Sequence, residues 1–219
     1  MRIGILGSGS IGGALGRSWA QAGHDVVFAS RHPDRLADLV ARANREAGEH
    51  GRGGATRAGT SDEAMAHGEV VLDALPFAAS MQLDADALRG KLLVTASNLY
   101  PERDGDVDLG GRSQSQALAG RLPGARVVKA FNMMFARRMA ERADGKRGEA
   151  AGGEIAILLA GDDEAAKATA GGLIEEAGFV AVDAGGLGEG RLFQSGGPLY
   201  AKEMTGEAAR AALRQERST

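Results

Sequence analysis

Short apolar runs alternate with segments of helical periodicity along the first 130 residues of the chain. In the first helical segment, Ile11, Ala14, Leu15 and Trp19 fall three or four positions apart. Such alternation is typical of a parallel sheet with helices on both faces. We expect strands at residues 2–6, 25–29, 55–57, 70–74, 91–95 and 126–130, with helices at 10–22, 33–48, 61–66, 83–88 and 113–122.

The rest of the chain predicts a smaller unit of the same kind, with strands at 154–160 and 179–183 around a helix, and then a surface helix at 206–219. The segment before this unit is charged and rich in glycine, which is typical of an exposed loop. The predicted fold class is α/β, a Rossmann-type doubly wound parallel sheet with a small C-terminal α/β lobe. The predicted organisation is a dinucleotide-binding Rossmann domain at 1–136, an exposed border at 137–153 and a C-terminal lobe at 154–219.

A glycine motif stands between the first predicted strand and the first predicted helix. Gly7, Gly9 and Gly12 have the spacing Gly-x-Gly-x-x-Gly, in which the first glycine allows a tight turn, the second lets a phosphate approach the backbone and the third lets the helix pack closely on the strand. A helix N-terminus also presents unpaired N–H groups to an anion. We therefore expect this loop to hold the pyrophosphate of a dinucleotide; the alternative is a glycine turn without a ligand. The residues concerned are Gly7, Ser8, Gly9, Ser10, Ile11 and Gly12.

The residues after the second predicted strand indicate which dinucleotide binds. An NAD site usually has Asp or Glu there, whereas this chain has Ser30 and Arg31, with Arg35 a turn further on. A hydroxyl and a guanidinium would bind a 2′-phosphate, which a carboxylate would repel. We therefore predict NADP(H), although both arginines could also be ordinary solvated cations.

Composition narrows the classes of function. The chain has no cysteine, which excludes disulfides and thiolate chemistry, and its four histidines are not spaced with carboxylates as metal ligands would be. A net charge of −3 does not attract a polyanion such as nucleic acid. No apolar run approaches the roughly 18 residues of a membrane span. We expect a cytoplasmic protein that acts on a small-molecule redox acceptor, with neither nucleic acid nor a membrane as partner.

Several short motifs together resemble the deazaflavin (coenzyme F-420)-dependent NADP reductases, a family of dinucleotide-binding proteins that also includes the reductase domain of certain membrane metalloreductases. The resemblance covers about residues 1–193. It rests on Gly7-x-Gly9-x-x-Gly12, Ser30-Arg31, Ala74-Leu75-Pro76, Val128-Lys129-Ala130-Phe131-Asn132, Ala160-Gly161-Asp162-Asp163, Asp183-Ala184-Gly185-x-Leu187 and Arg191-Leu192.

The resemblance implies an N-terminal NADPH-binding lobe and a C-terminal lobe that closes a cleft over the nicotinamide. It places Ser30, Arg31 and Arg35 at the 2′-phosphate, and Asn98 and the segment from Lys129 to Asn132 near the nicotinamide and its ribose. Leu75 and Pro76 would stand at the carboxyl edge of the sheet, where ligands bind in such folds. A deazaflavin or flavin co-substrate and a homodimer are expected by the same resemblance.

The chain offers few candidates for acid–base catalysis, and hydride transfer between two rings needs chiefly their orientation. Lys129 could donate a proton or bind the cofactor, Asn132 could orient a carboxamide or cap a turn, and Tyr200 could cover an acceptor ring or lie in the core with its hydroxyl bound. Three functions stay open: a reductase of a flavin-like or deazaflavin acceptor, a reductase of a carbonyl or imine, and a non-catalytic NADPH-binding redox sensor.

Overall fold

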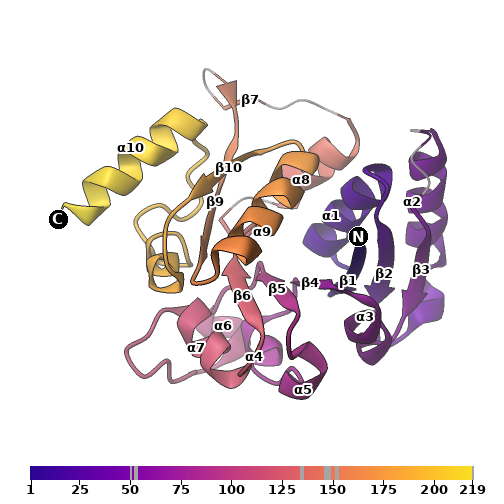
Figure 1. The fold of residues 1–219 in the computed structure, drawn as a ribbon, viewed down its shortest axis with the longest axis horizontal. Helices are drawn as coiled ribbons and strands as arrows, with labels where there is room; N and C mark the ends of the chain where they lie inside the picture. Colours follow the sequence, from indigo (N-terminus) through magenta and orange to yellow (C-terminus); the bar gives the residue numbers. More distant parts are fainter. Residues whose placement is uncertain (50, 52–53, 134–135, 146–148, 151–152, 219) are drawn as a thin grey trace.

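The protein is built around one mixed sheet of eight strands, in the order β10-β9-β6-β5-β4-β1-β2-β3 (Figure 1). The computed structural model describes residues 1–49, 51, 54–133, 136–145, 149–150 and 153–218. The strands of this sheet are β1 (Arg2–Leu6), β2 (Asp25–Ala29), β3 (Thr56–Gly59), β4 (Val70–Asp73), β5 (Leu92–Thr95), β6 (Arg126–Lys129), β9 (Ala156–Gly161) and β10 (Val180–Asp183); β7 (Glu149–Ala150) and β8 (Gly153–Glu154) pair separately.

Helices connect the strands and cover both faces of the sheet. In Figure 1, α2 and α10 lie at opposite ends of the molecule. The longer helices are α1 (Ser10–Gln21), α2 (Ala37–Glu49), α3 (Ser61–His67), α7 (Gln114–Arg121), α8 (Ala136–Ala143), α9 (Glu164–Glu176) and α10 (Gly206–Arg217). The short ones are α4 (Phe77–Ser80), α5 (Ala85–Leu88), α6 (Pro101–Asp104) and the 3₁₀ segments η1 (Pro33–Leu36) and η2 (Leu187–Leu192).

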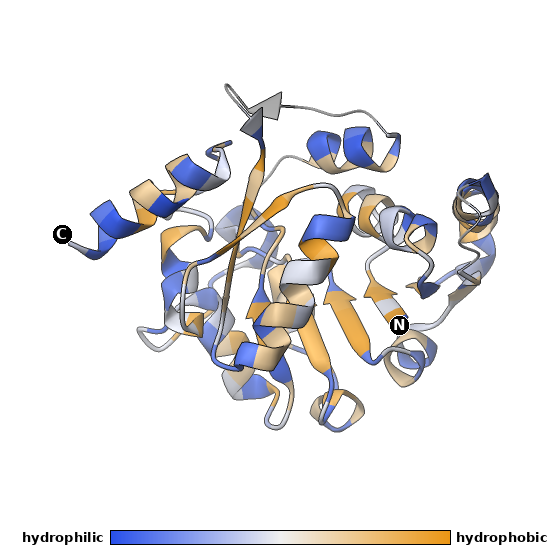
Figure 2. Ribbon diagram, turned by 45° about the horizontal axis from the view of Figure 1, so that its top comes forward, coloured by the Kyte–Doolittle hydropathy of each residue, from blue (hydrophilic) through white to orange (hydrophobic). Residues whose placement is uncertain are grey.

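The strand order confirms the predicted fold class. From β1 the chain runs outward through β2 and β3, and then returns to run outward on the other side through β4, β5 and β6, all in parallel. The neighbours β1 and β4 therefore mark the point where the strand order reverses, which is where doubly wound sheets bind ligands. All four residues of β4 and all four of β5 are buried, as expected for strands covered on both faces. Figure 2 shows these apolar strands inside a shell of helices with polar outer faces.

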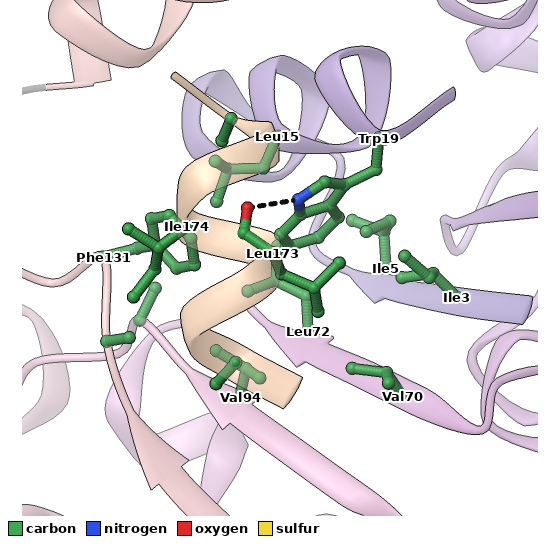
Figure 3. Packing of buried hydrophobic residues seen from close by; sticks show 14 of the residues in the cluster. Ile3, Ile5, Leu15, Trp19, Val70, Leu72, Val94, Phe131, Leu173 and Ile174 are labelled. Carbon is green, nitrogen blue, oxygen red and sulfur yellow. Dashed lines mark hydrogen bonds between the residues drawn. The ribbon is translucent and has the colours of Figure 1, made fainter. Parts of the chain in front are cut away.

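The C-terminal strands continue the same sheet. β9 pairs antiparallel with β6, and β10 pairs parallel with β9. The indole Nε1 of Trp19 in α1 donates a hydrogen bond of 2.9 Å to the carbonyl oxygen of Leu173 in α9, and the indole meets the ring of Phe131 edge-on (Figure 3). The division into a domain at 1–136 and a lobe at 154–219 stays a prediction, and the two segments share a sheet and a core.

The expected exposed loop at 137–153 is wrong in its first half. Residues there form α8, whose Met139 and Ala143 are buried in the main core against α1. These two apolar residues lie four positions apart, so a narrow apolar stripe runs along a helix that is otherwise charged. Because many residues of this segment are charged, the apolar stripe was not recognised from the sequence. Residues 146–148 and 151–152 of that prediction lie outside the described part.

Candidate functional site

The glycine loop after β1 forms the turn that the sequence predicts. Gly7 has a φ of 92°, a left-handed conformation that favours glycine, and a Cβ there would stand 2.6 Å from the carbonyl oxygen of Ala74. A Cβ on Gly12 would stand 2.0 Å from the carbonyl oxygen of Gly7. Gly7 is therefore required by the close approach of the loop to the segment after β4, and Gly12 by the close approach of α1 to the end of β1.

Gly9 differs from both, because a Cβ there would meet nothing within 4 Å. It is the N-cap residue of α1, no side chain caps this helix N-terminus, and the first turn holds no acidic residue. The N–H groups of the first turn, which include those of Ser10 and Ile11, are therefore available to an anion. The open space beside an uncapped helix N-terminus fits the pyrophosphate of a dinucleotide.

The hydroxyl of Ser8 is used within the protein. It donates a hydrogen bond of 2.6 Å to the carbonyl oxygen of Ala29, the last residue of β2. The glycine loop is thereby fixed to the strand end that carries the predicted 2′-phosphate residues. Ser8 contributes its position in this loop, and its side-chain hydrogen is already donated.

Ser30, Arg31 and Arg35 follow β2 as predicted. The Ser30 N–H donates to the carbonyl oxygen of Gly59 in β3, and its Oγ accepts from the N–H of His32 at 3.0 Å, which leaves the hydroxyl hydrogen to donate elsewhere. Arg31 and Arg35 are exposed, and no side-chain hydrogen bond or ion pair joins either guanidinium to another described residue. Two cations that form no ion pair with a described residue thus follow a hydroxyl at this strand end.

A cavity of about 550 Å³ lies at the reversal point of the sheet. Ile11 of α1, Leu75 and Pro76 after β4, Asn98 after β5 and Asn132 after β6 all line it. The structure thus brings together five residues that the sequence analysis assigned to cofactor binding. They meet because the carboxyl ends of parallel strands lie at one edge of the sheet.

Asn98 and Asn132 are joined by two hydrogen bonds in the cavity wall. Asn98 Nδ2 donates to the carbonyl oxygen of Asn132 at 2.8 Å, and Asn132 Nδ2 donates to Asn98 Oδ1 at 3.1 Å and to the carbonyl oxygen of Phe193 at 2.8 Å. Both partners of this Nδ2 are acceptors, which fixes the orientation of the Asn132 amide. Its Oδ1 is buried and has no hydrogen-bond partner among the described residues. A buried acceptor without a donor is costly, and an N–H group is what this oxygen lacks.

Lys129 does not line the cavity. It is only 1% exposed, and its Nζ donates to the carbonyl oxygen of Ser97 at 3.0 Å. Burial lowers the pKa of Lys129 to about 7, against the opposing charge of Asp73. The lysine therefore acts beneath the cavity wall, on the backbone of Ser97, and the structure does not bring it to the cofactor site.

Sequence reasoning missed Asp73, which forms a buried polar row with Thr95 and Lys129. The three residues are paired in register at the ends of β4, β5 and β6. The carboxylate of Asp73 accepts from Thr95 Oγ1 and from Ser80 Oγ, both at 2.8 Å, and burial raises its pKa. A carboxylate at the end of the otherwise apolar strand β4 was the available signal. The row fixes the backbone turns that carry the cavity residues.

Tyr100, Arg103 and Tyr200 also line the cavity, and sequence reasoning singled out only Tyr200. The hydroxyls of Tyr100 and Tyr200 are hydrogen-bonded to each other. Burial and this bond raise the pKa of Tyr200 to about 12. Tyr200 is therefore a partly buried wall residue with its hydroxyl bound, and its place over an acceptor ring stays a prediction.

Comparison with solved structures finds the same architecture in several proteins. A hypothetical protein from Sinorhizobium meliloti is 28% identical with a TM-score of 0.74, over 94% of this chain and 95% of its own. A protein from Arthrobacter sp. FB24, provisionally described as an F420-dependent NADP reductase, is 28% identical with a TM-score of 0.65, over 85% and 86% of the two chains. An imine reductase of Streptomyces aurantiacus, at 18% identity and a TM-score of 0.58 over 86% and 57%, shares the fold.

The likeness to the Arthrobacter protein, together with a family match over residues 2–99, indicates an NADP-dependent oxidoreductase. Within that class, residues 2–99 match the model of the family described as NADP oxidoreductase, coenzyme F420-dependent, which confirms the predicted resemblance. The rat metalloreductase STEAP3 is 31% identical over 193 residues, which is 87% of this chain and 35% of that protein, so the chain spans about a third of this curated relative. No helix in the described part of the chain is long and apolar enough to cross a membrane.

Proposed function

We propose that this protein transfers hydride between NADP(H) and a flat flavin-like or deazaflavin acceptor in the cavity between α1 and the ends of β4, β5 and β6. The observation that carries the proposal is the cavity of about 550 Å³, whose wall includes Ile11, Leu75 and Pro76. Asn132 also lines it, and the buried Oδ1 of this residue has no hydrogen-bond partner among the described residues. A nicotinamide ring is flat and apolar, and its carboxamide carries N–H donors. NADPH, when bound, supplies the hydride.

The residues of this chain bind and orient in the proposed reaction. The first turn of α1 holds the pyrophosphate, and Ser30, Arg31 and Arg35 hold the 2′-phosphate. Asn132 accepts from the carboxamide, and Asn98 holds Asn132 in place. Because a well-oriented pair of reactants can gain about 7–11 kcal/mol of barrier reduction from positioning alone, no ionising group need act on the nicotinamide.

A reductase of a carbonyl or imine is the second candidate. The phenol hydroxyls of Tyr100 and Tyr200 favour it, because they lie in the cavity wall where a substrate heteroatom needs a donor. Lys129, which the sequence offered as that donor, is buried and bound to Ser97, so it does not support this candidate.

Anaerobic incubation with NADPH and a panel of acceptors tests the proposal. The panel contains 5-deazariboflavin, riboflavin, a quinone and a cyclic imine, and the loss of the reduced nicotinamide absorbance is followed. We expect the fastest loss with 5-deazariboflavin or riboflavin. Preferred oxidation by the imine would support the second candidate. Tight NADPH binding with no oxidation by any acceptor would instead favour the redox sensor.

A further inference from the structure

Two tyrosines from distant parts of the chain meet at the cavity. Tyr100 lies between β5 and α6, and Tyr200 follows η2 near the C-terminus. Both line the cavity, and their hydroxyls form one hydrogen bond with each other. The cavity wall thus includes a pair of hydrogen-bonded phenols that come from two distant segments of the chain.

A count of hydrogens shows what this pair can offer. Two hydroxyls carry two hydrogens, and only one of them is used in their mutual bond. No side chain or carbonyl in the described part of the chain accepts the second one. The pair therefore has one O–H available to a molecule in the cavity. At neutral pH this hydrogen is present, because burial holds the pKa of Tyr200 at about 12.

A cation lies close to one ring of the pair. The guanidinium of Arg103 lies 5.0 Å from the ring centroid of Tyr100. The same guanidinium is held by the Asp104 carboxylate at 2.8 Å and by the carbonyl oxygen of Asn98 at 2.8 Å. A cation at this distance stabilises negative charge that develops on the phenol ring. Asp104 partly offsets the cation and at the same time fixes its position.

We propose that the Tyr100–Tyr200 pair is the proton donor to the acceptor, an inference that rests on the proposed function. NADPH gives its hydride to an electrophilic carbon of the acceptor, where a C–H bond forms. The available phenol O–H breaks and its proton goes to a nitrogen or oxygen conjugated to that carbon. The phenolate then takes a proton from water, so NADPH, acceptor and one proton give NADP⁺ and the reduced acceptor.

This assignment defines the acceptor by its chemistry. The carbon that takes the hydride must be conjugated to a nitrogen or oxygen that can take the proton, as in a flavin-like or deazaflavin ring. Tyr100 and Tyr200 become catalytic residues, and Arg103 a positioning residue that acts through Tyr100. The phenol pair and Asn132 line the same cavity.

The experiment measures the hydride step in Tyr100→Phe, Tyr200→Phe and the double variant, by anaerobic single turnover of NADPH with 5-deazariboflavin. We expect each single variant to lose about a hundredfold in rate, since general acids typically contribute 10²–10⁴-fold. The double variant should lose no more than either single one, because the two residues act as a unit. NADPH affinity and the thermal midpoint should not change. Thr169→Val, which removes a hydroxyl that donates to Ala165 in α9, is the control and should keep the wild-type rate.

A second readout does not depend on turnover. The chain has two tyrosines, so protein labelled with ¹³C at tyrosine Cζ gives two signals, both from this pair. We expect both signals to shift when 5-deazariboflavin is added to the NADP⁺ complex. Wild-type rates in both single variants, with unmoved tyrosine signals, would overturn the inference and leave the proposed function standing. If the wild type reduces none of the acceptors in the panel, the proposed function and this inference fail together.

Discussion

Replacement of Gly9 by valine separates cofactor binding from folding more sharply than any other change in the glycine loop. Gly9 has φ −76° and ψ −158°, an extended conformation that valine adopts readily, and its Cβ meets nothing within 4 Å. The variant should fold with an unfolding free energy equal to the wild type or higher by about 0.4–1 kcal/mol, since it loses glycine entropy in the unfolded chain. The valine methyls would occupy the space beside the first N–H groups of α1. Loss of two charge-assisted phosphate contacts at about 1.5–3 kcal/mol each should weaken NADPH binding by a hundredfold or more.

Gly12→Ala is the matched control, because its Cβ would stand 2.0 Å from the carbonyl oxygen of Gly7. We expect this variant to lose about 1–3 kcal/mol of unfolding free energy through overpacking between α1 and β1. Isothermal titration calorimetry with NADPH and urea unfolding are measured on both variants. Normal NADPH binding by Gly9→Val would show that the pyrophosphate lies elsewhere, and a stability loss equal to that of Gly12→Ala would show that the space beside Gly9 is not open.

Three further predictions follow from the site and the core. Arg31→Ala should weaken NADPH binding by about tenfold or more and leave NADH binding unchanged, because only NADPH carries the 2′-phosphate. Both affinities are measured by calorimetry. Equal weakening of the two cofactors would show that Arg31 does not bind the 2′-phosphate. Burial lowers the pKa of Lys129 from 10.5 to about 7, so the unfolded chain binds more protons than the native one between these values, and Lys129 makes stability rise with pH across this window. The stability of Lys129→Met relative to the wild type should therefore be highest near pH 7 and fall towards pH 10 in urea unfolding. Its turnover should fall by about one or two decades because Ser97 loses its donor. A stability difference that does not vary with pH would refute the assignment. Trp19→Phe should cost about 1–3 kcal/mol in thermal unfolding, because it opens space in the core and removes the hydrogen bond to Leu173, and an unchanged midpoint would show that this contact does not join the two segments.

The sequence predicts the N-terminal half of the fold well because its signals are local. Five of the six strands from β1 to β6 contain a short apolar run, and β3 (Thr-Arg-Ala-Gly) is the exception. The pairing of β9 with β6 is antiparallel and joins residues more than 25 positions apart, which no local pattern reveals. The helix α8 was missed because Met139 and Ala143 are two apolar positions among four charges.

For the candidate site, too, the sequence located some residues and not others. Ile11, Leu75, Asn98 and Asn132 were predictable because each follows a strand end or opens a helix, and strand ends of a parallel sheet converge on one edge. Lys129 also ends a strand, yet it is buried beneath Ser97, because the last residue of a strand still alternates between the two faces of the sheet. The position of Lys129 in the sequence therefore indicated the carboxyl edge of the sheet correctly, but it did not indicate which way the side chain points.

The chemistry of the acceptor side depends on a contact that no sequence pattern contains. Tyr100 and Tyr200 are a hundred residues apart, and each alone reads as an amphipathic aromatic residue. Their hydroxyls bond to each other in the cavity wall, which leaves one hydroxyl hydrogen without an acceptor among the described residues, and the cation of Arg103 lies 5.0 Å from the ring centroid of Tyr100. The sequence shows no single side chain suited to act as the acid. In the inferred mechanism the donor is a pair of phenols, which stays protonated until the acceptor takes the proton.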